Sequence, residues 1–394
     1  MSISLKSRID AYVCKFWERK DKKREARNPP TETGLGRQKS KTRTQLLLME
    51  VISLMDISPR LLVVRRGQEE ESFHCGRVVV ATTTGETVLA LGDVEAPVFP
   101  RSAIKPIQAI PLVASGAAEK YDLSDAEISL ACGSHGGSPL HVAAAQSILK
   151  KIGSSQNALE CGVHWPLDSG ESRALAARGE EPTVLHNNCS GKHCGFLAVG
   201  ALRDLDMAGY TKVSHPVMRE VTSVISLLTG VELRESQACI DGCAIPTFSI
   251  PLVSVATGFA RLGTGKGLSS SLVSSVSRIR SAIVQNPAML SGEGRADTRI
   301  TEESQGEVFV KSGAEGVMAA AIPALGYGLA VKIDDGAQRA ATAVMANLIL
   351  QVLQKHNVAT TKAVEVLQSY SHFLLKNWNG TPVGSVEPVL FTEL

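Results

Sequence analysis

The chain has 394 residues, of which 44% are hydrophobic and 20% charged, with a formal net charge of +2. This composition is that of a globular protein long enough to bury a core, and it excludes a chain that is disordered throughout. Eight cysteines in so long a chain are too few for a disulfide scaffold, and the apolar runs fall short of the ~20 residues that a membrane span needs. We therefore expect a reduced, cytoplasmic protein with no membrane partner.

The N-terminal segment differs from the rest, because positions 1–45 carry 13 Lys and Arg against 5 Asp and Glu. This basic block has no core-forming periodicity and no recognisable nucleic-acid motif, and its acidic residues argue against a mitochondrial transit peptide. The sequence predicts a disordered basic extension at 1–55, one folded domain at 56–394, and no nucleic-acid partner.

Strands and helices intermix along the folded domain. Glycine-marked turns separate short β-rich runs, and helices are indicated by apolar residues at helical spacing, with a capping box formed by Ser124 and Glu127. The predicted strands cover 61–66, 77–83, 87–92, 307–310 and 328–334. The predicted helices cover 101–121, 124–131, 139–153, 215–230, 268–287 and 338–356. This order predicts a mixed α/β (α+β) fold with a sheet flanked by helices.

The stretch 101-RSAIKP-106 contains a Ser-x-x-Lys motif. Residues three apart share one face of a helix, so a desolvated Lys105 could act as the base that activates Ser102 as a nucleophile. The motif alone also occurs by chance in many long proteins. Its apolar surroundings favour the catalytic interpretation.

Two further motifs follow in the order known from penicillin-binding proteins and class A β-lactamases, which combine S-x-x-K, S-D-N and K-T-G. Ser134 lies in the glycine-flanked 132-CGSHGG-137, where small residues allow a substrate to approach the backbone. Lys311 begins a K-S-G at the end of a predicted strand. Each motif in isolation is also compatible with an ordinary turn.

The cysteines allow a metal site of more than one kind. Cys189 and Cys194 fit the long limit of a zinc-ligand pair, and Cys239 with Cys243 supplies a distant second pair, which gives a four-cysteine structural site. Such a site leaves the neighbouring Lys192 unexplained. All of these cysteines could also be buried apolar residues.

A three-ligand site is the alternative. If Cys189 and Cys243 come together, they offer two thiolates to a soft divalent cation such as Zn²⁺. The third ligand would be Lys192 as a neutral amine or His193, the more conventional choice.

Seven segments together resemble, in the same order, motifs of the rhizobial-type L-asparaginases, the asparaginase II family. They are 101-RSAIKPIQ-108, 132-CGSHGG-137, 187-NNCSGKHCGF-196, 240-IDGCAIPT-247, 286-NPAMLSGEGRADT-298, 311-KSGAEG-316 and 328-GLAVKIDDG-336. The resemblance runs from about Leu61 to near the C-terminus. It implies that 56–394 is a catalytic domain with a fold similar to serine β-lactamases and glutaminases, in a homodimer that hydrolyses L-asparagine to L-aspartate and ammonia.

The resemblance also implies roles for individual residues. It implies two Ser–Lys pairs, Ser102 with Lys105 and Ser134 with Lys311. It implies zinc ligands, namely Cys189, Lys192 and Cys243. It implies substrate-binding residues, namely Arg101, His193 and Asp241. Two other readings stay open, which are a glutaminase or β-lactamase-like amidohydrolase and an inactive metal-binding regulator on the same fold.

Overall fold

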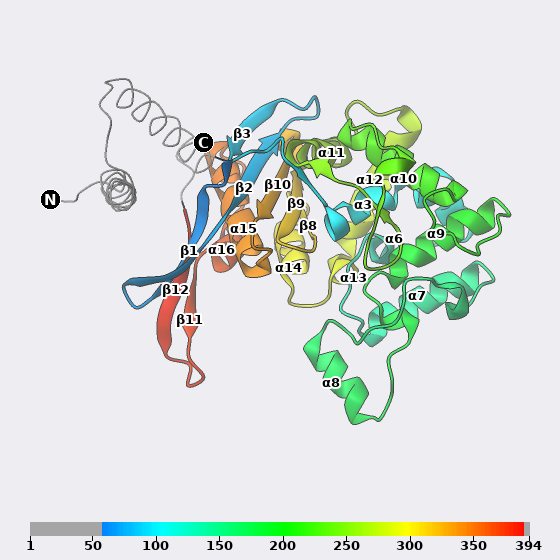
Figure 1. The fold of residues 1–394 in the computed structure, drawn as a ribbon, viewed down its shortest axis with the longest axis horizontal. Helices are drawn as coiled ribbons and strands as arrows, with labels where there is room; N and C mark the ends of the chain where they lie inside the picture. Colours follow the sequence, from blue (N-terminus) through cyan, green and yellow to red (C-terminus); the bar gives the residue numbers. More distant parts are fainter. Residues whose placement is uncertain (1–56, 390–394) are drawn as a thin grey trace, which may run out of the picture. The chain divides into compact units, whose positions relative to one another are not determined.

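The computed structural model describes residues 57–389. The predicted extension 1–55 therefore lies outside the described residues. Helices flank an eight-stranded sheet in which all neighbouring strands run antiparallel, with the order β11-β12-β1-β2-β10-β9-β8 and β3 paired to β2 (Figure 1). This architecture confirms the predicted mixed α/β class.

The strands of the sheet are β1 Arg60–Arg66, β2 Glu69–Ala81, β3 Thr87–Leu91, β8 Phe309–Ser312, β9 Val317–Ile322, β10 Tyr327–Ile333, β11 Phe373–Lys376 and β12 Pro382–Pro388. The first half of the long β2 pairs with β1 and its second half with β10. The exchange of partners falls at Gly76, where a Cβ atom would lie 2.2 Å from the Lys332 carbonyl oxygen. Only glycine permits this close approach of two backbones.

The helices are α3 Lys105–Gln108, α4 Ile110–Ala114, α5 Ala117–Lys120, α6 Asp125–Ala131, α7 Pro139–Lys151, α8 Ser169–Ala177, α9 Ser190–Leu202, α10 Pro216–Thr229, α11 Leu252–Thr264, α12 Ser270–Gln285, α13 Pro287–Leu290, α14 Ala296–Glu303, α15 Gln338–Lys355 and α16 Thr361–Ser371. Shorter elements are the 3-10 helix η1 Arg101–Ile104 and the strands β4 Pro97–Val98, β5 Cys239–Ile240, β6 Pro246–Thr247 and β7 Ile250–Pro251.

The two faces of the sheet bury separate apolar clusters. Along β2, Val78 and Val80 pack into the cluster that α15 covers, whereas Val79 and Ala81 pack into the cluster that contains α11. This is the period-two alternation of a strand buried on both faces. Gly328 in β10 lets α11 approach, because a Cβ atom there would lie 1.9 Å from the Ala256 carbonyl oxygen.

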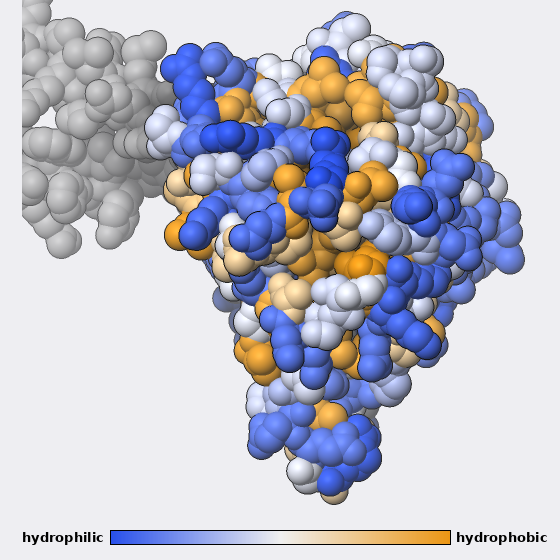
Figure 2. All heavy atoms as spheres, turned by 90° about the vertical axis from the view of Figure 1, so that its right-hand side faces the viewer, coloured by the Kyte–Doolittle hydropathy of each residue, from blue (hydrophilic) through white to orange (hydrophobic). Residues whose placement is uncertain are grey.

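At one side of the sheet, α9 is packed against α4, α5, α6, α7 and α10 (Figure 1). All residues of α9 from Ser190 to Gly200 are buried. A helix that is buried on every side belongs to the core, so its lysine, histidine and cysteine lie in the interior rather than on the surface. By contrast, α8 and its flanking loops form the mostly hydrophilic lower part of the face in Figure 2.

Most predicted elements are present with small shifts at their ends. The capping box of α6 forms, with the Glu127 N–H donating to Ser124 Oγ and the Ser124 N–H to Glu127. The predicted helix 101–121 is wrong as one element, since the chain there forms η1, α3, α4 and α5. Prolines within this stretch start new short helices instead of continuing one, because proline lacks the amide donor of a helix interior.

Candidate active site

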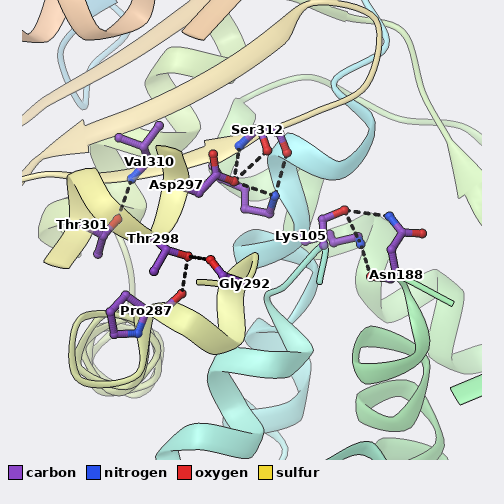
Figure 3. A network of polar contacts seen from close by, with 11 residues as sticks. Lys105, Asn188, Pro287, Gly292, Asp297, Thr298, Thr301, Val310 and Ser312 are labelled. Atoms are coloured by element: carbon purple, nitrogen blue, oxygen red, sulfur yellow. Dashed lines mark hydrogen bonds and ion pairs between the residues drawn. The ribbon is translucent and has the colours of Figure 1, made fainter. Parts of the chain in front are cut away.

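A buried lysine, a serine and an asparagine meet where three segments converge. Lys105 begins α3, Ser134 lies in the loop after α6, and Asn188 precedes α9. The Lys105 amine lies 3.2 Å from Ser134 Oγ and donates to the Asn188 carbonyl oxygen at 3.2 Å. The Asn188 side-chain amide donates to Ser134 Oγ at 2.8 Å (Figure 3). The hydroxyl is therefore held from two sides.

The loop that carries Ser134 is fixed by close packing on the end of α13. The Ser134 N–H donates to the Leu290 carbonyl oxygen at 2.7 Å. At the preceding Gly133, a Cβ atom would lie 2.7 Å from the Met289 carbonyl oxygen. Glycine is thus required here for the backbone to approach, and the approach sets the position of the serine.

Burial changes the acid–base character of Lys105, whose exposure is only 1%. Burial lowers the pKa of this amine to about 8, and the positive charges of Lys192 and Lys311 act in the same direction, while the Cys189 thiolate opposes them. A lysine with this pKa has a substantial neutral fraction near pH 8 and can accept a proton from a hydroxyl.

The predicted pairing of Ser102 with Lys105 stays a prediction, because the hydrogen bonds of Lys105 lead elsewhere. Within residues 57–389, no side-chain hydrogen bond joins Ser102 to Lys105, and the amine contacts Ser134 instead. Ser102 belongs to the 3-10 helix η1, which ends at Ile104, whereas Lys105 begins α3. The catalytic roles of both serines stay predictions.

The predicted pairing of Ser134 with Lys311 also has a different outcome. Lys311 is fully buried in β8, and its amine lies 3.2 Å from Asp297 Oδ2 and donates to the Ser312 carbonyl oxygen at 2.7 Å. Its hydrogen bonds in the described part of the chain do not reach Ser134. Asp297, in the first turn of α14, is therefore the partner of this lysine (Figure 3).

Three potential metal ligands lie close together at the start of α9. Cys189 is the N-cap residue of α9, Lys192 follows in its first turn, and Cys243 lies in the turn between β5 and β6. The Lys192 amine lies 3.1 Å from Cys243 Sγ, and the two thiols are close enough to shift each other's pKa. All three residues are buried. The structure thus brings these three residues together, and their role as zinc ligands stays a prediction.

Their protonation follows from this proximity. The hydrogen bond from Cys243 holds the pKa of Cys189 well below its ordinary value, and the charges of Lys105 and Lys192 outweigh the opposing effect of burial. That same hydrogen bond, together with burial, raises the pKa of Cys243. Burial alone would lower the pKa of Lys192, but Cys189, Cys243 and Asp241 together raise it.

The donor chemistry fits a soft divalent cation, since two thiols and one amine face one another in a closed, buried site. No three His, Cys, Asp or Glu side chains between positions 57 and 389 group into a metal site. A cation would have to displace protons from the amine and from Cys243.

The remaining predicted residues near this set face elsewhere. Cys194 donates to the Ala145 carbonyl oxygen at 3.6 Å, and Cys239 is exposed. The four-cysteine alternative is therefore not formed in the described part of the chain. His193, predicted on the substrate side, is fully buried, with Nδ1 2.6 Å from the Tyr210 hydroxyl.

Arg101 and Asp241, two predicted substrate-binding residues, form an ion pair at the edge of the site. Arg101 has a φ of 51°, a left-handed conformation that is costly for a residue with a side chain and is held here by the surrounding structure. A cleft of about 390 Å³ opens beside this pair. Its walls include Phe99, Arg101, Ile240, Gly242, Glu315 and Lys332.

A second cleft, of about 280 Å³, borders the loop that carries Ser134. Gly136 and Ser138 contribute to it from the loop, and Asp168, Ser291 and Arg295 face them. The serine loop is therefore flanked by open space on this side, although Ser134 itself is 9% exposed.

Comparison with known proteins agrees with the motifs. The sequence model of the L-asparaginase II family matches residues 62–388, so the chain belongs to this family, as its motifs predicted. The family places the protein among the amidohydrolases. Among solved structures, the chain is similar to a crystal structure of a β-lactamase from Mycobacterium bovis, with 14% sequence identity and a TM-score of 0.34 over 75% of this chain and 95% of that chain. No curated protein matches the sequence.

None of the helices described between residues 57 and 389 combines the length and the apolar character needed to cross a bilayer.

Two residues of the site escaped the sequence reasoning. Asn188 and Asp297 lie inside segments that the family resemblance used, 187–196 and 286–298, but neither has a spacing that reveals its partner. Both act on groups more than ten positions away, at Ser134 and Lys311. Such long-range partners become visible only in the folded chain.

Proposed function

We propose that the protein is an L-asparaginase that hydrolyses the side-chain amide of L-asparagine to L-aspartate and ammonia by Ser–Lys catalysis. Membership in the L-asparaginase II family supports the reaction class. The observation that carries the mechanism is the Lys105 amine 3.2 Å from Ser134 Oγ in a buried site. A lysine of lowered pKa beside a hydroxyl can act as the base that removes the hydroxyl proton.

In this reaction the neutral Lys105 takes the hydroxyl proton as the serine oxygen attacks the amide carbon. The tetrahedral intermediate collapses when the departing nitrogen receives a proton, which releases ammonia and leaves an ester on the serine. Water then hydrolyses the ester and restores the hydroxyl. The hydrogen bonds favour Ser134 as the activated hydroxyl, and Ser102, one turn before Lys105, is the alternative.

We further propose that Cys189, Lys192 and Cys243 hold one Zn²⁺ per chain. A bound zinc ion supplies positive charge and Lewis acidity next to the serine loop. Because protons compete for the thiolates and the amine, binding should weaken as the pH falls. Metal analysis should find about one equivalent in the wild type and in Cys194→Ser, and a clear loss in Cys189→Ser and Lys192→Ala. Full zinc retention in both of the latter variants would overturn this ligand set.

The function is tested by ammonia release from asparagine and from glutamine, and by hydrolysis of a β-lactam. Asparagine should be the preferred substrate. Ser134→Ala should abolish the activity with little change in stability. If Ser102→Ala alone abolishes it, Ser102 carries the ester, and trapping the acyl-enzyme for mass spectrometry identifies the residue directly. The homodimer implied by the resemblance is checked by light scattering.

A further inference from the structure

The ion pair between Asp297 and Lys311 is supported by further hydrogen bonds to the same carboxylate oxygen. A single oxygen, Asp297 Oδ2, receives three hydrogen bonds, from the Ser312 N–H at 2.9 Å, from Ser312 Oγ at 2.7 Å and from the Lys311 amine at 3.2 Å. Both side chains are buried, Lys311 with 0% and Asp297 with 4% of the side chain exposed. Three donors on one oxygen fix the orientation of this carboxylate beside the lysine.

Several groups around Lys311 change the pKa of its amine in opposite directions. Burial is the largest influence on the pKa of Lys311 and lowers it, and the Arg295 guanidinium acts in the same direction. Asp297 is the main opposing influence, and the Cys189 thiolate adds to it. Lys105 and Cys132 are the other titratable groups whose charge interacts with this amine. Asp297 therefore counteracts the effect of burial on the pKa of this amine.

We propose that Asp297 is a positioning residue that keeps Lys311 protonated and fixed behind the serine loop, so that Lys311 serves the reaction as a stationary positive charge and not as a base. This inference rests on the proposed amidohydrolase function. In a buried site of low dielectric, such a charge stabilises negative charge that develops on the substrate oxygen during attack. It also leaves Lys105 as the lysine that exchanges a proton with a serine hydroxyl.

Asp297→Asn tests the proposal, because asparagine keeps the shape and removes the charge. Since an opposite charge at this range moves a pKa by about 1–3 units, the alkaline limb of the kcat profile should move about 1–3 pH units lower. Below that limb, kcat should recover towards the wild-type value, while KM changes little. Glu127→Gln is the matched control, since it breaks another buried acid–lysine pair, with Lys151 at 2.7 Å, outside the site. It should lower stability without moving the alkaline limb.

An unmoved alkaline limb in Asp297→Asn makes the ion pair structural and overturns the proposal. An acid limb that moves to lower pH instead makes Lys311 a base, and this outcome overturns the proposal as well.

Urea unfolding as a function of pH gives a readout that does not depend on activity. Without Asp297, the folded-state pKa of Lys311 falls further below its unfolded value of 10.5. The unfolded chain then binds more protons than the folded one between these two values, so stability rises with pH across that window. The deficit of Asp297→Asn relative to the wild type should therefore shrink from pH 7 to pH 10.

The same Asp297→Asn change in a Lys311→Met background should lose this pH dependence. A deficit that is independent of pH, or that persists in the methionine background, overturns the coupling of Asp297 to Lys311. If the wild type hydrolyses none of the offered amides, the proposed function fails, and the unfolding experiment still decides the ion pair.

Discussion

Replacing Lys105 by methionine should remove catalysis and preserve the fold. Methionine is unbranched, of similar length, and apolar, which suits a position that is 1% exposed. The change removes the two hydrogen bonds of the amine, to Ser134 Oγ and to the Asn188 carbonyl oxygen. Such bonds contribute about 0.5–1.5 kcal/mol each. Ser134 keeps the amide of Asn188 as a partner.

The loss is offset because burying the charged amine is itself unfavourable. The pKa of Lys105 falls from 10.5 to about 8. At 1.36 kcal/mol per unit, this corresponds to about 3 kcal/mol against the charged form. The free energy of unfolding should therefore change by no more than about 2 kcal/mol. Loss of a general base lowers kcat by about 10²- to 10⁴-fold.

Lys151→Met is the matched control, and it should show the opposite pattern. Lys151 pairs with Glu127, whose side chain is 4% exposed, so the change leaves a buried carboxylate without its cation and costs about 1–3 kcal/mol of stability. Asparagine turnover should be retained. Ammonia release and urea unfolding measure the two properties. If Lys105→Met retains turnover near the wild-type rate, another group is the base and the mechanism is wrong.

Three further predictions concern pH, substrate binding and the N-terminus. The value of kcat/KM should rise with pH through about 8, since Lys105 must lose its proton to act as a base; a flat profile between pH 6 and pH 9 would speak against it. Arg101→Lys should raise KM several-fold more than it lowers kcat, because lysine cannot reproduce the guanidinium geometry of the pair with Asp241; a fall in kcat alone would contradict a role in substrate binding. Deletion of residues 1–54 should leave activity and melting temperature nearly unchanged, because every motif lies beyond that segment; insoluble protein would contradict this expectation.

The sequence was sufficient for the elements whose signals are local. The capping box of Ser124 and Glu127 begins α6 as predicted, and the serine-rich stretch 268–287 forms α12, because its leucine and valine spacing outweighs its composition. The C-terminal strands β11 and β12 were missed. They contain no long apolar run, and β12 owes its position to pairing with β1, more than 300 residues away in the chain.

In the candidate site, too, some contacts were predicted from the sequence and others were not. Cys189, Lys192 and Cys243 come together as the family resemblance implied, because α9 begins at the cysteine and carries the lysine on its first turn. The two Ser–Lys pairs stay predictions, and the hydrogen bonds of both lysines to other segments were not predicted, since spacing along the chain cannot show that a side chain will reach across to another segment. Lys105 reaches the loop after α6, and Lys311 reaches α14.

The three buried lysines differ in the charged groups that lie beside their amines. Lys311 is paired with the carboxylate of Asp297, and Lys192 lies against Cys243 and near the Cys189 thiolate, so each has an anionic partner that favours its proton. Lys105 makes its two side-chain hydrogen bonds to a hydroxyl and a carbonyl oxygen, which carry no charge. The Cys189 thiolate only partly offsets its burial, and the two neighbouring cations oppose its proton further. In an interior that penalises every charge, burial outweighs this thiolate and lowers the pKa of Lys105 to about 8. That lysine is also the one in contact with a serine hydroxyl, which is the combination that amide hydrolysis requires.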